Sequence, residues 1–457
     1  MTCDQHAPAQ EGQLLRKTLQ GFGIFLTALH PIKLVLIGYA SYVLLGWVLL
    51  CLPFSQRVPS PTPLDHLFTA CSAVSTTGLA TVSTSGSYSL FGQIVILLLI
   101  QLGGMGYMTF SSFVLLSRRR TLSEARLEVG RTVFSLPRNF VIDKFIRSVI
   151  VFTVILEGIG TVALWFAFRR HDVEYPLWNA VFHSVSAFCT AGFSLYDTSL
   201  EAFRDDFWVN AILIFLSYMG ALGFIVCVDV WRRITGKVEH VTLTTKIILH
   251  TTFWITLVAV AVFFVSEPSL QTMPTDKRLL ASFFQVMTAL TTVGFNTVPI
   301  SGLSHASLLL VSMLMIIGAS PSGTGGGLKS TTFSAIIGII KSTLKGDKEV
   351  RFWKRQIPEE RLRAAVATFC MYFLMLFLGT YLLTLTEQAP FHGIVFEAAS
   401  ALGTVGLSTG ITATLSNVGK LIVTGLMFIG RLGPLTFGLA LFFTANALQP
   451  EHEDIAI

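Results

Sequence analysis

The sequence is poor in charged residues. Asp, Glu, Lys and Arg make up only 13% of its 457 residues, whereas 52% are hydrophobic. Soluble globular domains carry about 25% charged residues. A long chain with this deficit is typical of an integral membrane protein, so the composition argues against a soluble domain.

The chain also lacks the signals of several other protein classes. Its six cysteines have no CxxC spacing and most lie in apolar segments, which predicts neither a disulfide framework nor a metal site. The net charge of +6 does not indicate binding of nucleic acid, because the basic residues lie in short loops between apolar segments. The first 20 residues contain Asp4, Glu11, Arg16 and Lys17 and no apolar core, so we expect no cleaved signal peptide.

What the chain does contain is a series of long apolar segments, each able to cover the roughly 20 helical residues that a bilayer requires. A shorter apolar segment lies between the members of each pair, and at about 1.5 Å per residue it reaches about halfway across. The long segments are Leu34–Pro53, Ser89–Leu116, Ser148–Phe168, Phe207–Val228, Ile247–Val265, Ala306–Ile340, Ala364–Leu385 and Leu421–Leu448. The short segments are Leu64–Thr77, Leu177–Ala191, Leu279–Val293 and Ile394–Val405.

This pattern predicts an all-α integral membrane protein built from four pseudo-repeated units around one central pore. Each unit contains a full helix, a half helix that ends in a glycine loop, and a second full helix. We place the pore units at 34–117, 142–231, 244–341 and 363–448, with an N-terminal segment at 1–33 and a C-terminal tail at 449–457.

Loop charge predicts the orientation. The connections between units, 117–147, 231–246 and 341–363, hold 8, 4 and 8 of the 32 Lys and Arg residues, whereas the connections within units hold 7. Positively charged loops face the cytoplasm. We therefore expect both termini to be cytoplasmic and the half helices to enter from the outer face.

Each half helix ends in the same short phrase, which is an expected binding site for a monovalent cation. The phrase has Ser or Thr first, Ala second, Thr fifth, Gly seventh and Leu or Phe eighth in all four copies. Glycine allows successive carbonyls to turn toward one axis, and a ring of carbonyls replaces the hydration shell of the cation. Close helix packing is the alternative role of small residues, but four equivalent copies favour the filter. The predicted filter residues are Thr76, Thr77, Gly78, Thr190, Ala191, Gly192, Thr292, Val293, Gly294, Thr404, Val405 and Gly406.

A second glycine phrase follows 24–28 residues after each filter glycine, inside the second full helix. In units one and two we interpret it as a site of tight helix packing. In unit three, residues 318–327 contain almost nothing that favours a helix, which predicts a broken helix and an intramembrane gating loop. The gate candidates are Gly318, Ser320, Gly323, Thr324, Gly325, Gly326, Gly327, Lys329 and Arg431.

Two basic residues in apolar surroundings have alternative interpretations. Arg431 is either a cationic guard below the filter or the partner of Glu397 in a structural ion pair, and the two are compatible. Lys329 either anchors the glycine loop or extends toward the cytoplasmic surface.

The stretch from Gly323 to Ser330 resembles a nucleotide-binding P-loop, but Leu328 stands where the second glycine is required. A membrane-embedded enzyme that uses Lys329 or Glu157 is the competing class of function, and the fourfold repeat argues against it.

The four glycine loops, the break at 318–327 and the segment 430–434 together resemble the Ktr/Trk/HKT superfamily of potassium transporters over residues 34–448. The length is similar to that of the KtrB type. The resemblance implies potassium uptake across the cytoplasmic membrane, often as sodium-dependent symport, with an intramembrane gate and no bound cofactor other than ions. It also implies a homodimer on a cytoplasmic ring of nucleotide-binding regulatory subunits, which the loops 117–147 and 341–363 could face. Some plant relatives have Ser at the first filter glycine and favour sodium, so Gly78 favours potassium. A sodium-permeable or other monovalent-cation transporter of the same architecture is the alternative.

Overall fold

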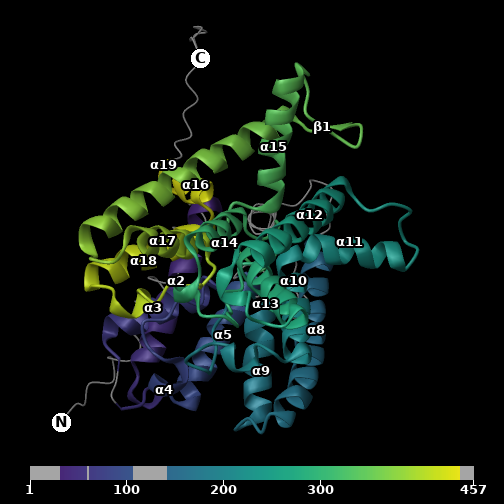
Figure 1. Ribbon diagram of the computed structural model, residues 1–457. Helices are drawn as coiled ribbons and strands as arrows, with labels where there is room; N and C mark the ends of the chain where they lie inside the picture. Colours follow the sequence, from purple (N-terminus) through teal and green to yellow (C-terminus); the bar gives the residue numbers. More distant parts are fainter. Residues whose placement is uncertain (1–30, 59–60, 107–141, 443–457) are drawn as a thin grey trace, which may run out of the picture.

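The computed structural model describes residues 31–58, 61–106 and 142–442, and these fold almost entirely into α-helices (Figure 1). The prediction of an all-α chain built from four repeated units is confirmed. Most of the N-terminal segment, most of the first basic connection and the C-terminal tail lie outside the described residues.

The first helix of each unit is long and faces outward. These helices are α2 (Pro31–Cys51), α8 (Ile142–Arg170), α12 (Leu243–Ser266) and α16 (Glu359–Thr386). Each is long and apolar enough to cross a membrane, although only 22–28% of the residues in its most apolar stretch are buried. Large apolar side chains such as Leu44, Val154, Phe253 and Phe377 are exposed on them. Apolar helices with exposed apolar faces are the structures that lipid accommodates.

The half helices occupy the centre of the molecule. They are α3 (Pro63–Val74), α9 (Pro176–Phe188), α13 (Thr275–Leu290) and α17 (Phe391–Gly403). A proline stands at the start of each one, either as the first helical residue or just before it, where its fixed φ suits a helix start. Ten residues before each filter glycine is a fully buried phenylalanine: Phe68, Phe182, Phe284 and Phe396.

The second helix is interrupted in units two, three and four. The interruption in unit three was predicted, whereas those in units two and four were not. In unit two, α10 (Phe207–Leu222) meets α11 (Phe224–Ile234) at 98°, and in unit four α18 (Asn417–Leu432) meets α19 (Pro434–Phe442) at 96°. In unit three, α14 (His305–Ile317) and α15 (Ser330–Lys345) are separated by the glycine-rich loop. In unit one, α5 (Leu90–Met105) ends at the limit of the described residues. Figure 1 shows α11 running sideways from the bundle.

Glycines with positive φ lie at the ends of these helices. Gly106, Gly223, Gly318 and Gly433 have φ of +79°, +86°, +66° and +87° at the ends of their helices. This region of φ is strained for any residue with a Cβ. The packing interpretation for units one and two is therefore incomplete. The first glycine of each phrase does pack closely, since a Cβ on Gly103 or Gly220 would lie 2.1 or 1.9 Å from a half-helix carbonyl, but the last glycine ends the helix.

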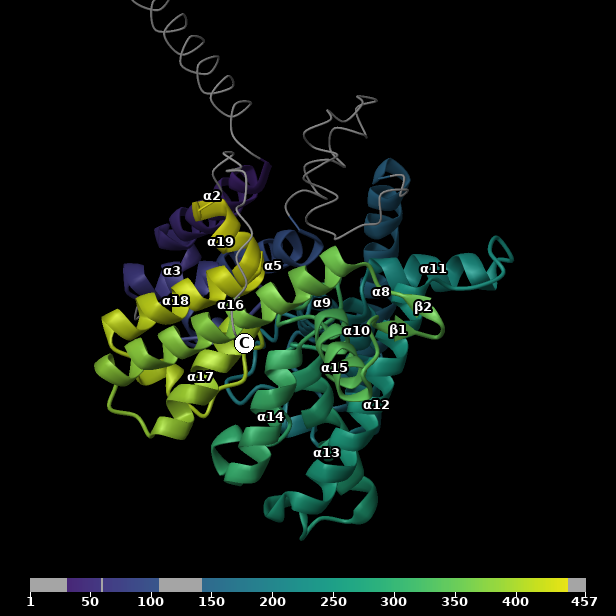
Figure 2. The ribbon, with the colours of Figure 1, turned by 90° about the horizontal axis from the view of Figure 1, so that it is seen from above.

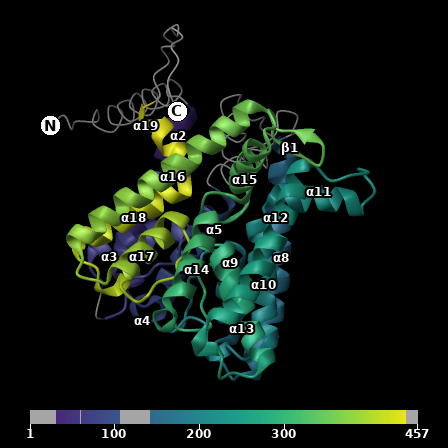
Figure 3. The ribbon, with the colours of Figure 1, turned by 45° about the horizontal axis from the view of Figure 1, so that its top comes forward.

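The second helix of each unit packs against the half helix of the next unit. The contacts run from α5 to α9, from α10 to α13, from α14 to α17 and from α18 to α3, which closes a ring. Figures 2 and 3 show the two halves of that ring, with the purple and yellow units one and four on one side and the teal and green units two and three on the other.

Short elements complete the described part of the chain. A two-residue antiparallel hairpin, β1 (Arg351–Phe352) and β2 (Arg355–Gln356), follows α15 and pairs Arg351 with Gln356. The remaining elements are α4 (Thr84–Ser87) and the 3-10 turns η1 (Pro53–Ser55), η2 (Glu201–Phe203), η3 (Pro268–Leu270), η4 (Ile300–Gly302) and η5 (Thr412–Thr414).

In units three and four, a glutamate at the end of the first long helix forms hydrogen bonds with the start of the second helix. Glu267 follows α12 and accepts hydrogen bonds from the backbone N–H and the hydroxyl of Ser304, each at 3.1 Å, where α14 begins. Glu387 makes the equivalent contacts with Ser416 at the start of α18. Burial favours a raised pKa for Glu267, but hydrogen bonds from Ser307, Ser269 and Ser304 outweigh it and lower that pKa below its ordinary value.

Candidate functional site

Each half helix ends in the same capping arrangement, known as a Schellman motif. The backbone N–H of Thr77 donates to the carbonyl of Ser72 at 2.9 Å, and the N–H of Thr76 donates to the carbonyl of Ala73 at 3.1 Å. The other three loops repeat both bonds at the equivalent positions. This motif satisfies helix-end carbonyls and needs one residue in the left-handed conformation. The Ser/Thr-Ala start of the phrase is therefore the last turn of the half helix.

The left-handed residue is a threonine in every loop. Thr76, Thr190, Thr292 and Thr404 have φ of 52°, 51°, 59° and 49°. A β-branched residue rarely adopts this conformation, and such strain costs about 1–3 kcal/mol per residue. All four side chains are fully buried. Strain repeated at four equivalent positions marks a site whose geometry the surrounding structure maintains.

The four glycine loops form one closed ring. A Cβ on Gly78 would lie 2.3 Å from the carbonyl oxygen of Ala191, and one on Gly192 would lie 2.2 Å from that of Val293. The series continues from Gly294 to Val405 at 2.0 Å, and from Gly406 back to Thr77 at 2.1 Å. Each glycine thus contacts the carbonyl before the next glycine, in the order of the units. Any side chain at these positions would displace a carbonyl of the neighbouring loop.

The glycine-rich loop of unit three lies directly against the filter threonines. Gly326 donates its backbone N–H to Oγ1 of Thr292 at 3.1 Å, and a Cβ on it would lie 2.1 Å from Oγ1 of Thr404. Thr324 contacts the other two threonines, because Thr76 donates to its carbonyl at 3.2 Å and its hydroxyl lies 3.1 Å from that of Thr190. The loop therefore covers one end of the ring.

Arg431 and Lys329 hold this loop by its carbonyls. Arg431 donates to the carbonyl of Thr324 and to that of Gly103 at the end of α5. Lys329 donates from Nζ to the carbonyl of Gly325 at 2.6 Å. Of the two alternatives for Lys329, the contact with the glycine-rich loop is the one that the structure has, since the ammonium group turns back onto the loop.

Of the two alternatives for Arg431, the ion pair with Glu397 does not form. Glu397 is fully buried and accepts hydrogen bonds from Ser408, at 2.8 Å, and from Thr412. Both hydroxyl donors follow the fourth filter glycine, so the carboxyl group braces the outer part of that loop. Arg431 approaches from the opposite end of the ring, where carbonyls attract it.

Glu157 has a partner on a neighbouring helix, as its position in an apolar helix predicts. Gln101 of α5 donates from Nε2 to the carboxylate at 3.2 Å. The two residues that an enzyme would use, Glu157 and Lys329, are thus each occupied in separate structural contacts.

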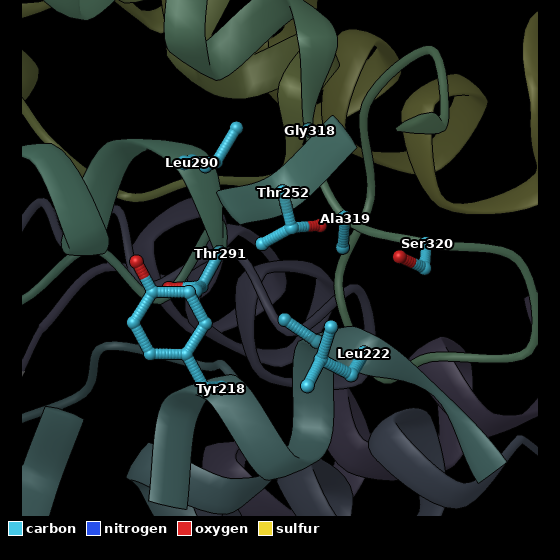
Figure 4. Close-up of a pocket in the computed structure, with 9 residues that line it drawn as sticks. Tyr218, Leu222, Thr252, Leu290, Thr291, Gly318, Ala319 and Ser320 are labelled. Atoms are coloured by element: carbon cyan, nitrogen blue, oxygen red, sulfur yellow. The ribbon is translucent and has the colours of Figure 1, made fainter. Parts of the chain in front are cut away.

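A small pocket lies beside the start of the glycine-rich loop (Figure 4). Ala319 and Ser320 form one wall, and Tyr218 and Leu222 of α10 lie across from them. Leu290 at the end of the half helix α13 and Thr291 directly after it also line the pocket. The pocket is small, with a volume of about 10 Å³, so it holds at most about one water molecule.

The sequence reasoning missed two features of the site, of which only one has a signal in the sequence. The contacts of Thr324 depend on the folded path of the loop, and no sequence signal distinguishes Thr324 from neighbouring residues. The buried phenylalanines, in contrast, recur ten residues before each filter glycine and are visible in the sequence.

Known proteins resemble the chain over nearly its whole length. The family model of TrkH, described as a cation transport protein, matches residues 49–448. The Ktr system potassium uptake protein B of Bacillus subtilis is 35% identical over 93% of this chain and 96% of its own length. Its namesake from Vibrio alginolyticus is 35% identical over 93% and 94%. The potassium/sodium uptake protein NtpJ of Enterococcus hirae is 32% identical over 93% and 96%.

A solved structure supports the fold. The crystal structure of the potassium transporter TrkH from Vibrio parahaemolyticus superposes with a TM-score of 0.72, covering 90% of this chain and 84% of that one at 19% identity. At this identity the likeness concerns the architecture alone.

Proposed function

Since the chain belongs to the TrkH family of cation transport proteins and is of the KtrB type, we propose that it carries potassium into the cell through the ring of four glycine loops. The observation that carries the proposal is the closed contact of each filter glycine with a carbonyl of the next loop. The most similar relatives above are named as potassium uptake proteins, which supports potassium as the cargo. These relatives are transporters by name, and the chain is not an enzyme.

The twelve filter residues predicted from the sequence are the proposed potassium ligands. Backbone carbonyls at fixed positions replace the water around a dehydrated cation. The backbone carbonyl oxygens of these residues, three per loop, supply ligands without any charged side chain. The half helices add the negative ends of their dipoles, which also favour a cation.

The glycine-rich loop is the proposed gate. In its present position it contacts all four filter threonines, so an ion leaving the filter meets its backbone. Opening requires the loop to leave Thr76 and Thr292 and to release Arg431.

A sodium-permeable transporter of the same architecture is the second candidate. The name of NtpJ, a potassium/sodium uptake protein, favours it. Gly78 and its three counterparts favour potassium, because no side chain disturbs the ring. The two candidates separate in a competition assay in which sodium is added to a potassium uptake measurement.

The assembly of the protein follows from the Ktr name of its relatives. A Ktr system has more than one component, which supports a cytoplasmic regulatory partner for this chain. We propose that the chain forms a homodimer in the cytoplasmic membrane and binds a cytoplasmic ring of nucleotide-binding subunits. Both of its termini would lie in the cytoplasm, and its potassium uptake would depend on sodium. The hairpin β1–β2, with Lys354 and Arg355, belongs to the basic connection that would face the ring.

Growth and uptake in a cell without its own potassium uptake systems test the proposal. The chain, expressed with a Ktr-type regulatory subunit, should restore potassium uptake at low external concentration, and sodium should stimulate it. Failure to restore uptake while the protein is present in the membrane would refute the assignment.

A further inference from the structure

The first residue of the repeated phrase has two different roles, although it is Ser or Thr in every copy. In units one and four its hydroxyl accepts a hydrogen bond from the filter glycine. The N–H of Gly78 donates to Oγ of Ser72, and that of Gly406 donates to Oγ of Ser400, each at 3.1 Å.

In units two and three the same hydroxyl is a donor. Ser186 donates to the carbonyl of Phe193 at 2.8 Å, and Thr288 donates to the carbonyl of Phe295 at 2.6 Å. Both acceptors are the residue directly after the filter glycine. All four hydroxyl-bearing side chains are fully buried, so no difference in exposure explains the two patterns.

The direction of the outermost carbonyls follows from these bonds. A carbonyl oxygen that accepts from the half helix behind it points toward that helix, because the hydrogen lies near the lone pairs of the oxygen. The carbonyls of Phe193 and Phe295 are therefore turned away from the pore axis. Within the described part of the chain, no hydrogen bond is made to the carbonyls of Leu79 and Leu407, which leaves them free to face an ion.

The two patterns divide the ring into halves. Gly406 packs against the carbonyl of Thr77, so units four and one are neighbours, and Gly192 packs against that of Val293, so units two and three are neighbours. The free carbonyls thus lie side by side on one half of the ring, and the withdrawn carbonyls lie on the other. The sequence carries the same division, with Leu after the glycine in the first half and Phe in the second.

We propose that the outermost ion site of the filter has only two protein carbonyls, those of Leu79 and Leu407, and that water completes the shell on the side of units two and three. The inference rests on the proposed potassium pathway and specifies its outer end. A potassium ion would lose its water in two stages, first on one half of the ring and then, one layer deeper, on all sides. Ser186 and Thr288 are the positioning residues that keep this outer site weak.

Two matched double variants test the inference by the sign of their effects. Replacing Ser186→Ala together with Thr288→Val removes both donors with little change of shape and frees the carbonyls of Phe193 and Phe295. The apparent KM for potassium should fall by about fivefold, the factor that one ordinary hydrogen bond represents. Ser72→Ala with Ser400→Ala leaves two glycine N–H groups without acceptors, so it should raise the KM by a similar factor.

Each outcome decides one question. An unmodified chain that takes up no potassium would refute the proposed function, and the inference with it. An unmodified chain that transports, together with a Ser186→Ala/Thr288→Val variant whose KM is unchanged or raised, would overturn the inference alone. Ser186→Thr keeps the donor and should match the parent. If the double variant does not yield a monodisperse protein, the single Thr288→Val variant carries the same test, with a KM below that of the parent expected.

Discussion

Replacement of Arg431 tests how the loop beneath the filter is held. The guanidinium group donates to the carbonyl of Thr324 on the loop and to that of Gly103 on α5, so it joins the proposed gate to a neighbouring helix. Hydrogen bonds that involve a charged group contribute about 1.5–3 kcal/mol each. Only the bond to Thr324 is lost when the loop opens. Loss of the hydrogen bond from Arg431 to Thr324 should therefore increase the ratio of open to closed loop by between about tenfold and about a hundredfold.

The assay is rubidium or potassium flux into proteoliposomes at saturating cation, per amount of reconstituted protein. Arg431→Gln should raise this flux and leave the KM nearly unchanged, since the filter itself is intact. Arg431→Lys separates two explanations, because lysine keeps the charge but cannot bridge two carbonyls as a planar guanidinium does. If bridging holds the loop, Arg431→Lys also raises the flux. If the charge alone restricts flow, it stays at the parent level.

An arginine away from the pore provides the control. Arg363 is exposed and pairs with Glu359 one helical turn away, so Arg363→Gln should transport as the parent does. A parental flux in Arg431→Gln, with normal protein levels, would refute the account of the closed loop.

Three further outcomes follow from the same structure. Gly192→Ala should abolish uptake because its Cβ would lie 2.2 Å from the carbonyl of Val293. Gly158→Ala is the control and should behave as the parent, because no atom lies within 4 Å of a Cβ there. Equal uptake by the two variants would contradict the close contact between the glycine loops. Shortening residues 323–327 should raise flux, and a folded deletion with parental flux would end the assignment of the gate. The lowered pKa of Glu267 means that its carboxylate stabilises the protein at neutral pH, above the ordinary unfolded pKa of about 4.3, and that this contribution disappears as the pH falls through the folded pKa. The difference in thermal unfolding temperature between the parent and Glu267→Gln should therefore shrink below about pH 4, and a difference that is constant with pH would contradict the role of the carboxylate.

Local signals allowed the half helices to be predicted closely. The segment Leu64–Thr77 contains all of α3 but its first residue, and Ile394–Val405 contains most of α17, because proline at the start and the glycine phrase at the end are marked in the sequence itself. The fourfold pattern of helix, half helix and helix follows from the same signals. These features depend on backbone preferences that act over a few residues.

Breaks in the second helices depend on tertiary contacts and were only partly predicted. Gly318 lies in a run that disfavours a helix, so that break was expected. Gly223 follows Ala221 and Leu222, which favour a helix, and its break is explained by the glycine-rich loop, since a Cβ there would lie 2.5 Å from the carbonyl of Pro321. The sequence of unit two contains no pattern that predicts its contact with the glycine-rich loop of unit three.

Polar partners inside the site were the least predictable part. The sequence offers Glu397 as an acid for Arg431, but the fold places hydroxyls of Ser408 and Thr412 against the acid and backbone carbonyls against the base. Ser72 and Ser186 occupy the same position of the phrase, and only the folded loops distinguish an acceptor from a donor. The hydrogen-bond partner of each of these groups depends on the positions of neighbouring atoms within a few ångströms, which the sequence does not give.

The most direct test of the potassium filter is the competition of sodium with potassium uptake in Gly78→Ser. Gly78 has φ of +90°, and a Cβ on it would lie 2.3 Å from the carbonyl of Ala191, so serine must displace a carbonyl of the ring. The account predicts that the parent discriminates strongly against sodium and that the variant discriminates less. Sodium competition that is the same in the parent and in a folded Gly78→Ser variant would contradict the central claim.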